Sequence, residues 1–176
     1  MSHRIHAAAA LAALLLAQPS LAAEEPEVRT RHNALYLELG GNALIYSINY
    51  ERFLTTDLAL RVGAGFMSVN ANDQNNAEAR VSLLLAPVML GWTGARSGGH
   101  AFELGGGILV AYAGASVKDG AGGTDFQSGS RVWPTATVGY RYAPLQGGLH
   151  FKAAFTPVLI EKNFLPWFGV SAGVIF

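Results

Sequence analysis

The sequence predicts an all-β fold, an eight-stranded antiparallel up-and-down barrel that spans a membrane. Three observations predict it. The chain of 176 residues is 51% hydrophobic and only 14% charged, whereas a soluble domain carries roughly 25% charged residues. Successive segments alternate between large apolar and small or polar residues, which is the period of a strand with two different faces. Outside the N-terminus no apolar run is long enough for a helical span, which leaves the closed barrel among membrane-spanning structures.

The first 22 residues predict a cleavable signal peptide. Arg4 supplies the positive charge, and residues 7–17 form an apolar run of the length found in secretory signals. A membrane helix would need about 20 apolar residues. Residues 20–22 place small side chains at the two positions that determine cleavage, so we expect an exported protein.

Residues 23–33 are polar and are expected to form a loose periplasmic lead-in, so the barrel should occupy residues 34–176. The 12 basic and 12 acidic residues balance, which gives no electrostatic reason to expect a nucleic-acid partner. The chain has no cysteine, which excludes a disulfide frame and a thiolate metal site. We expect no cofactor, no metal and a monomer surrounded by outer-membrane lipid.

The first half of the barrel is expected to comprise four strands, at residues 34–40, 43–54, 58–67 and 80–92. In the first three, large apolar side chains take alternate positions: Leu35, Leu37 and Leu39; Leu44, Tyr46, Ile48 and Tyr50; Leu58, Leu60, Val62, Ala64 and Phe66. The fourth is nearly all apolar and contains Pro87, so alternation does not define which of its faces points inward.

The second half is expected to comprise four more strands, at residues 101–113, 132–142, 149–159 and 166–176. Their alternating apolar positions are Phe102, Leu104, Ile108, Val110 and Tyr112; Ala136, Val138, Tyr140 and Tyr142; Leu149, Phe151, Ala153 and Phe155; Phe168, Val170, Ala172, Val174 and Phe176. Most of these segments have the length of about 9 to 11 residues that a tilted membrane strand needs.

The connections between strands alternate in length. The second, fourth and sixth are compact, at residues 55–57, 93–99 and 144–148. The third and fifth are long and polar, at residues 68–79 and 114–131. Outer-membrane barrels have short periplasmic turns and longer outer loops, so we expect the two long segments to be loops on the outside.

The bulky apolar face is expected to contact lipid, because an eight-stranded barrel cannot hold the large residues of every strand inside. Aromatic residues near strand ends predict two interfacial girdles. The expected girdles are Trp92, Phe102, Tyr142, Phe151 and Phe176 toward the periplasm, and Phe66, Tyr112, Trp133 and Phe168 toward the outside.

Six charged residues share the inward face, and the expected salt-bridge network is Glu38, Glu51, Arg61, Glu103, Arg141 and Lys152. Inside a narrow barrel each charge needs a partner. The short turn before Leu58 should place Glu51 directly opposite Arg61 and in contact with it, and Glu103 should meet Arg141.

This network has two interpretations, an ion path or a packed plug that fixes strand register. We favour the plug because the interior of eight strands is only just wide enough for side chains. The outer half is expected to be roomier, and to be lined by Gly63, Gly65, Gly107, Thr135, Thr137, Thr156 and Ser171.

Enzymatic chemistry has little support in the sequence, so we expect no catalytic residue. A lipid hydrolase needs a nucleophile beside a base, and the inward neighbours of His150 are Lys152 and Arg141. The His-x-Ser pair of the lipid A deacylase family is absent after both His100 and His150. A lipid-acting enzyme that modifies lipid A or phospholipid is the alternative function, and a pore is a third.

Several stretches carry a family resemblance: residues 35–42, 46–53, 139–142, 155–157 and 166–176. The chain resembles the small eight-stranded outer-membrane barrels of the OmpA/OmpX type, and more narrowly a group of uncharacterised bacterial outer-membrane β-barrels. The resemblance implies a place in the cell outer membrane. It also implies that the barrel-assembly machinery reads the last strand through Phe168, Val170, Ala172, Val174 and Phe176. The expected role is structural or surface interaction, with a salt-bridged lumen that does not conduct.

Overall fold

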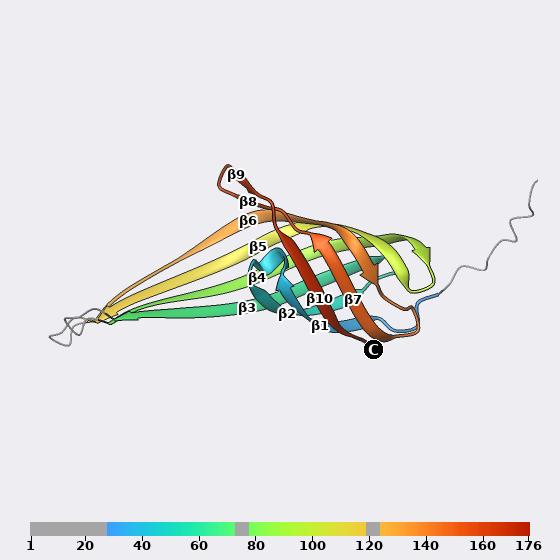
Figure 1. The fold of residues 1–176 in the computed structure, drawn as a ribbon, viewed down its shortest axis with the longest axis horizontal. Coiled ribbons are helices and arrows are strands. Elements are labelled where there is room, and N and C mark those ends of the chain that lie inside the picture. The colour runs from blue at the N-terminus through green and yellow to red at the C-terminus, as the bar shows by residue number, and fades with distance from the viewer. Residues whose placement is uncertain (1–27, 73–77, 119–123) are drawn as a thin grey trace, which may run out of the picture.

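A computed structural model describes residues 28–72, 78–118 and 124–176 as a closed antiparallel β-barrel (Figure 1). The elements within these residues are β1 (Asn33–Gly40), the 3-10 turn η1 (Gly41–Ala43), β2 (Tyr46–Phe53), β3 (Leu58–Asn72), β4 (Glu78–Ser97), β5 (His100–Lys118), β6 (Thr124–Tyr142), β7 (Gly148–Phe155), β8 (Val158–Ile160), β9 (Asn163–Leu165) and β10 (Phe168–Ile175). Within the described ranges, no helix is long and apolar enough to cross a membrane.

Pairing runs from each strand to the next and closes where β1 pairs with β10. The short strands β8 and β9 pair with each other and continue β7 and β10 beyond two interruptions, which fall at Pro157 and Pro166. Proline has no N–H to donate to a ladder, so the strand pairing breaks there. With these two continuations counted as part of β7 and β10, the barrel has the eight antiparallel strands that the sequence predicts.

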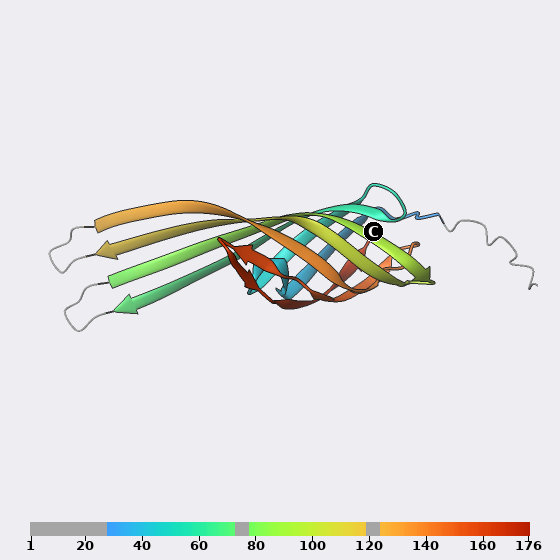
Figure 2. The same ribbon diagram turned by 90° about the horizontal axis from the view of Figure 1, so that it is seen from above.

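The expectation of two long outer loops is wrong. Strands β3 to β6 continue well past the other strands (Figure 2), with β3 paired to β4 as far as Asn72 and β5 paired to β6 as far as Lys118. The polar composition of residues 68–79 and 114–131 suggested loops. A sheet with both faces in water can carry polar side chains on either face, and the register set in the barrel simply continues.

The two faces of the barrel wall are as the alternation predicts. Leu60, Val138 and Val170 are exposed on the outside, whereas the side chains of Arg61 and Arg141 are buried in the lumen. The structure also settles the direction of the ambiguous fourth strand, β4. Its inward residues are Leu85, Pro87, Met89 and Thr93, and its outward residues are Leu84, Val88, Leu90 and Trp92.

Trp133 does not belong to the outer aromatic girdle. It lies on the inward face of β6, two residues from the buried Thr135, and packs against an apolar cluster at the outer end of the lumen. The cluster consists of Ala43, Leu85, Leu109, Ala111 and Val158. A second cluster packs at the opposite end, near the C-terminus: Ala34, Tyr36, Phe53, Ala59, Ala143 and Ile175. The polar lumen therefore lies between two apolar layers.

Candidate functional site

The most concentrated chemistry in the described residues lies in the closed lumen, and Arg141 of β6 is its centre. Its two terminal nitrogens donate to the two carboxylate oxygens of Glu51 on β2, at 2.7 and 2.8 Å. Its Nε donates to Oε2 of Glu103 on β5 at 3.2 Å. A bidentate arginine–carboxylate pair is among the stronger charge-assisted contacts in proteins. One guanidinium thus joins three strands across the barrel.

Glu38 of β1 forms the second half of the network. Its Oε1 lies 3.4 Å from a terminal nitrogen of Arg61 and 3.5 Å from Nζ of Lys152. Lys152 also lies 3.6 Å from Oε1 of Glu103, so it connects the two halves. The six predicted residues therefore lie in one network of three acids and three bases, and all six side chains are buried.

The predicted contact between Glu51 and Arg61 does not form. The two residues are register partners across β2 and β3, but no ion pair joins them. Glu51 reaches across the lumen to Arg141, and Arg61 turns to Glu38. The strand register identifies only the neighbouring residue on the adjacent strand. Long side chains inside a barrel can also pair with residues on the opposite wall, across the lumen.

The outer half of the lumen is filled rather than roomy, because the turn η1 folds into it. Asn42 donates from Nδ2 to Thr135 Oγ1 at 2.8 Å and to the Ala136 carbonyl at 2.9 Å. Its Oδ1 accepts from Thr137 Oγ1 at 3.0 Å and from Arg61. All the hydrogen-bonding capacity of this buried amide is used, so Asn42 locks the turn inside the barrel.

Glycine makes this inward turn possible. Gly40 and Gly41 both have φ of 70°, in the left-handed region that glycine tolerates best. A Cβ on Gly41 would lie 2.2 Å from the carboxyl carbon of Glu38. The Gly40-Gly41-Asn42 sequence was the available signal for a tight turn of this kind.

The other residues that were expected to line an open outer half of the lumen are closely packed or buried. Gly63 faces Asn49, whose Oδ1 would lie 2.3 Å from a Cβ added there. A Cβ added to Gly65 would contact the Tyr46 carbonyl, and one added to Gly107 would contact the Val88 carbonyl. Thr156 and Ser171 are both buried. These small residues let neighbouring groups approach closely, which is why they leave little space.

The end of the barrel opposite η1 is covered by the lead-in, which is not loose where the structure describes it. The amides of Thr30 and Arg31 donate to the Leu145 carbonyl at 3.0 and 3.3 Å. The guanidinium carbon of Arg29 lies 3.6 Å from the centre of the Phe53 ring, a cation–π contact. Burial lowers the pKa of Arg29 to about 10. The sequence-based interpretation missed Arg29, since nothing in a polar segment distinguishes it.

The enzyme hypothesis considered His150, a titratable residue of the lumen that lies outside the ion network. It is buried, and its ring packs edge-on against Tyr36 with centroids 4.8 Å apart. Neither ring nitrogen has a hydrogen-bond partner in the part of the chain that the structure describes. In the same residues, no group of three His, Cys, Asp or Glu side chains could hold a metal ion. The lumen offers ion pairing and packing.

Comparisons with known proteins place the fold. No protein-family model matches the chain, and no curated protein matches it in sequence. Among solved structures, it is similar to the N-terminal β-barrel domain of Pseudomonas aeruginosa OprF, with a TM-score of 0.57, 16% identity, and coverage of 85% of this chain and 100% of that one. It is also similar to Ail, the attachment invasion locus protein of Yersinia pestis, crystallised with the heparin analogue sucrose octasulfate. That comparison has a TM-score of 0.55, 10% identity, and coverage of 82% and 94%. The chain therefore has the eight-stranded fold of the OmpA/OmpX type of barrel.

The ion network predicts unequal costs for removing two arginines. Arg141→Met leaves the buried Glu51 without an ion-pair partner and removes one of the two partners of Glu103, and should lower the free energy of unfolding by about 3 to 5 kcal/mol. Arg96→Met removes a half-exposed pair with Asp57, at 2.9 Å, and should cost about 1 kcal/mol or less. Urea unfolding of the refolded barrel measures both. Equal losses in the two variants would contradict the central role of Arg141.

Proposed function

We propose that the protein is exported through a signal peptide at residues 1–22 and anchors in the outer membrane as a closed barrel. In this proposal the lumen does not conduct, and the outer four-stranded sheet binds a protein partner. The uncovered sheet beyond a plugged barrel is the observation that carries the proposal.

The outward surface supports the membrane placement. Large apolar side chains on every wall of the barrel are exposed, among them Leu37, Ile48, Val62, Leu90, Leu104, Val138, Phe151 and Val170. Contiguous apolar surface of this extent is costly in water, whereas hydrocarbon accommodates it. We also propose that Phe168, Val170, Ala172, Val174 and Phe176 form the signal for the barrel-assembly machinery.

The lumen contents support a barrel that does not conduct. The neutral ion network fills the middle, Asn42 and the turn η1 fill the outer half, and Arg29 lies over Phe53 at the periplasmic end. Eight strands leave an interior only wide enough for side chains. A conducting path would require several of these buried contacts to separate together.

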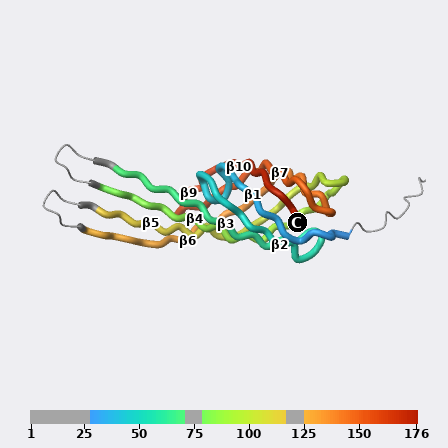
Figure 3. The backbone as a smooth tube through the Cα atoms, turned by 90° about the horizontal axis from the view of Figure 1, so that it is seen from below, coloured from blue at the N-terminus to red at the C-terminus, as the bar shows by residue number. Residues whose placement is uncertain are grey.

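On β3 and β4 the faces of the outer sheet are reversed relative to the barrel below. The side that continues the lumen is apolar and partly exposed there, with Met67, Val69, Val81 and Leu83, whereas β6 carries Arg131 and Asp125 on the same side. The side that continues the lipid-facing wall carries the hydroxyl groups of Ser68 and Ser82. The other strands of the barrel end before this extension of β3 to β6 (Figure 3). They therefore leave the apolar side of the extension uncovered.

This reversal favours a protein partner over a highly charged saccharide. Sucrose octasulfate is bound by Ail, and a polysulfated ligand requires several cations on one surface. The described side chains of the outer sheet present Arg80 and Arg131 on opposite faces. The apolar face of β3 and β4, beside the edge of β3 that is unpaired beyond Ala64, instead suits an extended protein segment.

The membrane placement predicts different effects for two valines on β3. Val62→Arg puts a cation in the apolar belt and should lower the free energy of unfolding in lipid by about 2 to 4 kcal/mol. Val69→Arg lies in the outer sheet, where a surface substitution should change the free energy of unfolding by less than about 0.5 kcal/mol. Unfolding in lipid vesicles measures both. A tolerated Val62→Arg would argue for a water-soluble protein.

Two assays test the closed lumen and the alternative of a lipid-acting enzyme. We expect no steady channels in planar bilayers, because buried pairs block the interior. We also expect the same lipid A and phospholipid profile in cells with and without the protein. Channels of porin size, or a modified lipid that appears only with the protein, would contradict the proposal.

Site-specific photo-crosslinking tests the outer sheet. A photoreactive residue at position 69, on the apolar side, should trap a protein partner on intact cells. The same residue at position 68, on the hydroxyl side of the same strand, is the matched control and should trap much less. Equal crosslinking at the two positions would show that the apolar side does not select the partner.

A further inference from the structure

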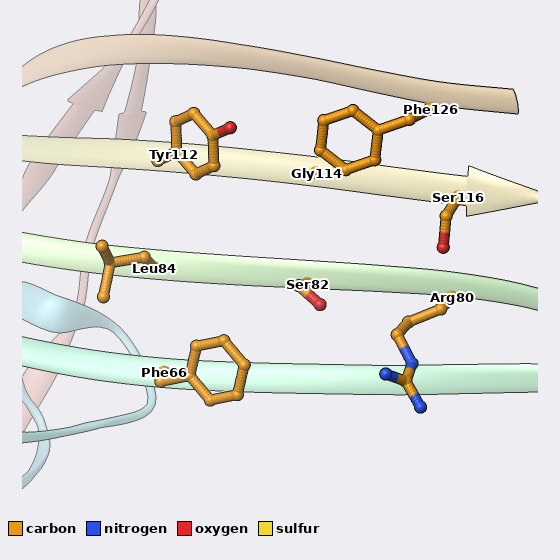
Figure 4. Close-up of a pocket in the computed structure, with 8 residues that line it drawn as sticks. All are labelled: Phe66, Arg80, Ser82, Leu84, Tyr112, Gly114, Ser116 and Phe126. Atoms are coloured by element: carbon orange, nitrogen blue, oxygen red, sulfur yellow. The ribbon is translucent and has the colours of Figure 1, made fainter.

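A groove of about 340 Å³ runs up the outward side of the sheet where the barrel ends and the outer extension begins. Its lower part consists of Phe66, Leu84 and Tyr112, which are neighbours in one row across β3, β4 and β5 (Figure 4). All three are exposed. They form the last row of the outward wall that consists only of large aromatic and aliphatic side chains.

The next row toward the tip of the sheet has small and polar residues in place of large apolar ones. Ser82 pairs with Gly114 there, and the missing side chain of Gly114 opens the middle of the groove. Phe126 crosses from β6 so that its ring lies over this glycine, at 3.5 Å from the position of an added Cβ. Phe126 is 66% exposed and forms an apolar wall on an otherwise polar surface.

Arg80 and Ser116 form the upper end of the groove and are register partners. The Nε of Arg80 donates to Asn70 Oδ1 at 2.9 Å, which directs the side chain toward β3 (Figure 4). Among the described side chains, the two terminal nitrogens of Arg80 have no other acceptor. A guanidinium presents paired donors that match a phosphate.

The order of these rows matches the cross-section of a membrane surface. Two residues along a strand span about 7 Å, so the cation lies roughly 13 Å from the aromatic row, with hydroxyl groups between. An acyl chain, a polar backbone and an anionic headgroup follow one another in a membrane lipid on the same scale. A free phosphate would not use the aromatic row, and an uncharged apolar ligand would not use Arg80.

We propose that this groove binds one phosphate-bearing lipid of the outer leaflet. An acyl chain packs on Phe66, Leu84 and Tyr112, and the phosphate accepts hydrogen bonds from Arg80. The inference rests on the proposed membrane placement and gives the barrel a specific lipid contact beside its protein-binding sheet.

Native mass spectrometry of the refolded full chain tests the groove. The probes are diphosphorylated lipid A and the same lipid with its phosphates removed, added in equal amounts. The wild-type chain should retain the phosphorylated form about fivefold more strongly, the order expected of one arginine near a membrane surface. Arg80→Gln should abolish this preference.

Two further variants keep the test independent of misfolding. Arg131→Gln removes a cation from the opposite face of the same sheet and should leave the preference unchanged. Gly114→Leu fills the middle of the groove and should reduce retention of both lipids while Arg80 stays in place. A preference that survives Arg80→Gln, or unchanged retention in Gly114→Leu, overturns the inference.

The membrane placement is read separately, from insertion into vesicles and the shift in gel mobility on heating. A chain that fails to insert overturns the proposed function and this inference together. A chain that inserts but shows no Arg80-dependent preference overturns the lipid groove alone.

Discussion

The structure depends on neutralising charge inside a barrel too narrow for bulk water. Three carboxylates and three cations form the buried ion network, and each is placed by a different strand. The bidentate contact between Arg141 and Glu51 joins β6 to β2 across the lumen, while Lys152 connects Glu38 to Glu103. Because an unpaired charge there would be very costly, this arrangement restricts how the walls of the barrel can pack against one another.

Two other segments complete what the ion network begins. The turn η1 places Asn42 against Arg61 and two threonines of β6, so the outer half is packed as well. At the other end Arg29 lies on the Phe53 ring. Neither segment is part of the barrel wall. Both are short connections or flanking chain, and they contribute because the barrel gives them a polar interior to enter.

The same alternation of side-chain direction continues from the barrel into the outer sheet, where the polarity of the two faces differs. In the barrel the odd positions of β3 face a polar lumen, and the even positions carry the exposed apolar side chains of the outer wall. Beyond the barrel the same alternation puts Met67 and Val69 on the lumen side and Ser68 on the other. The groove between Tyr112 and Arg80 lies where this reversal occurs, which is why it combines aromatic, hydroxyl and cationic groups.

The sequence by itself determined the all-β fold, the eight strands and the direction of nearly every side chain, because a period of two is local and survives any tertiary arrangement. It also identified the six residues of the ion network, but not the buried Arg29. The choice of Arg141 as the partner of Glu51, the inward turn at Asn42 and the length of β3 to β6 were decided only by the tertiary structure. Each depends on what lies across the barrel or beyond the next strand, and closure of the wall brings together residues whose separation in sequence carries no signal of their contact.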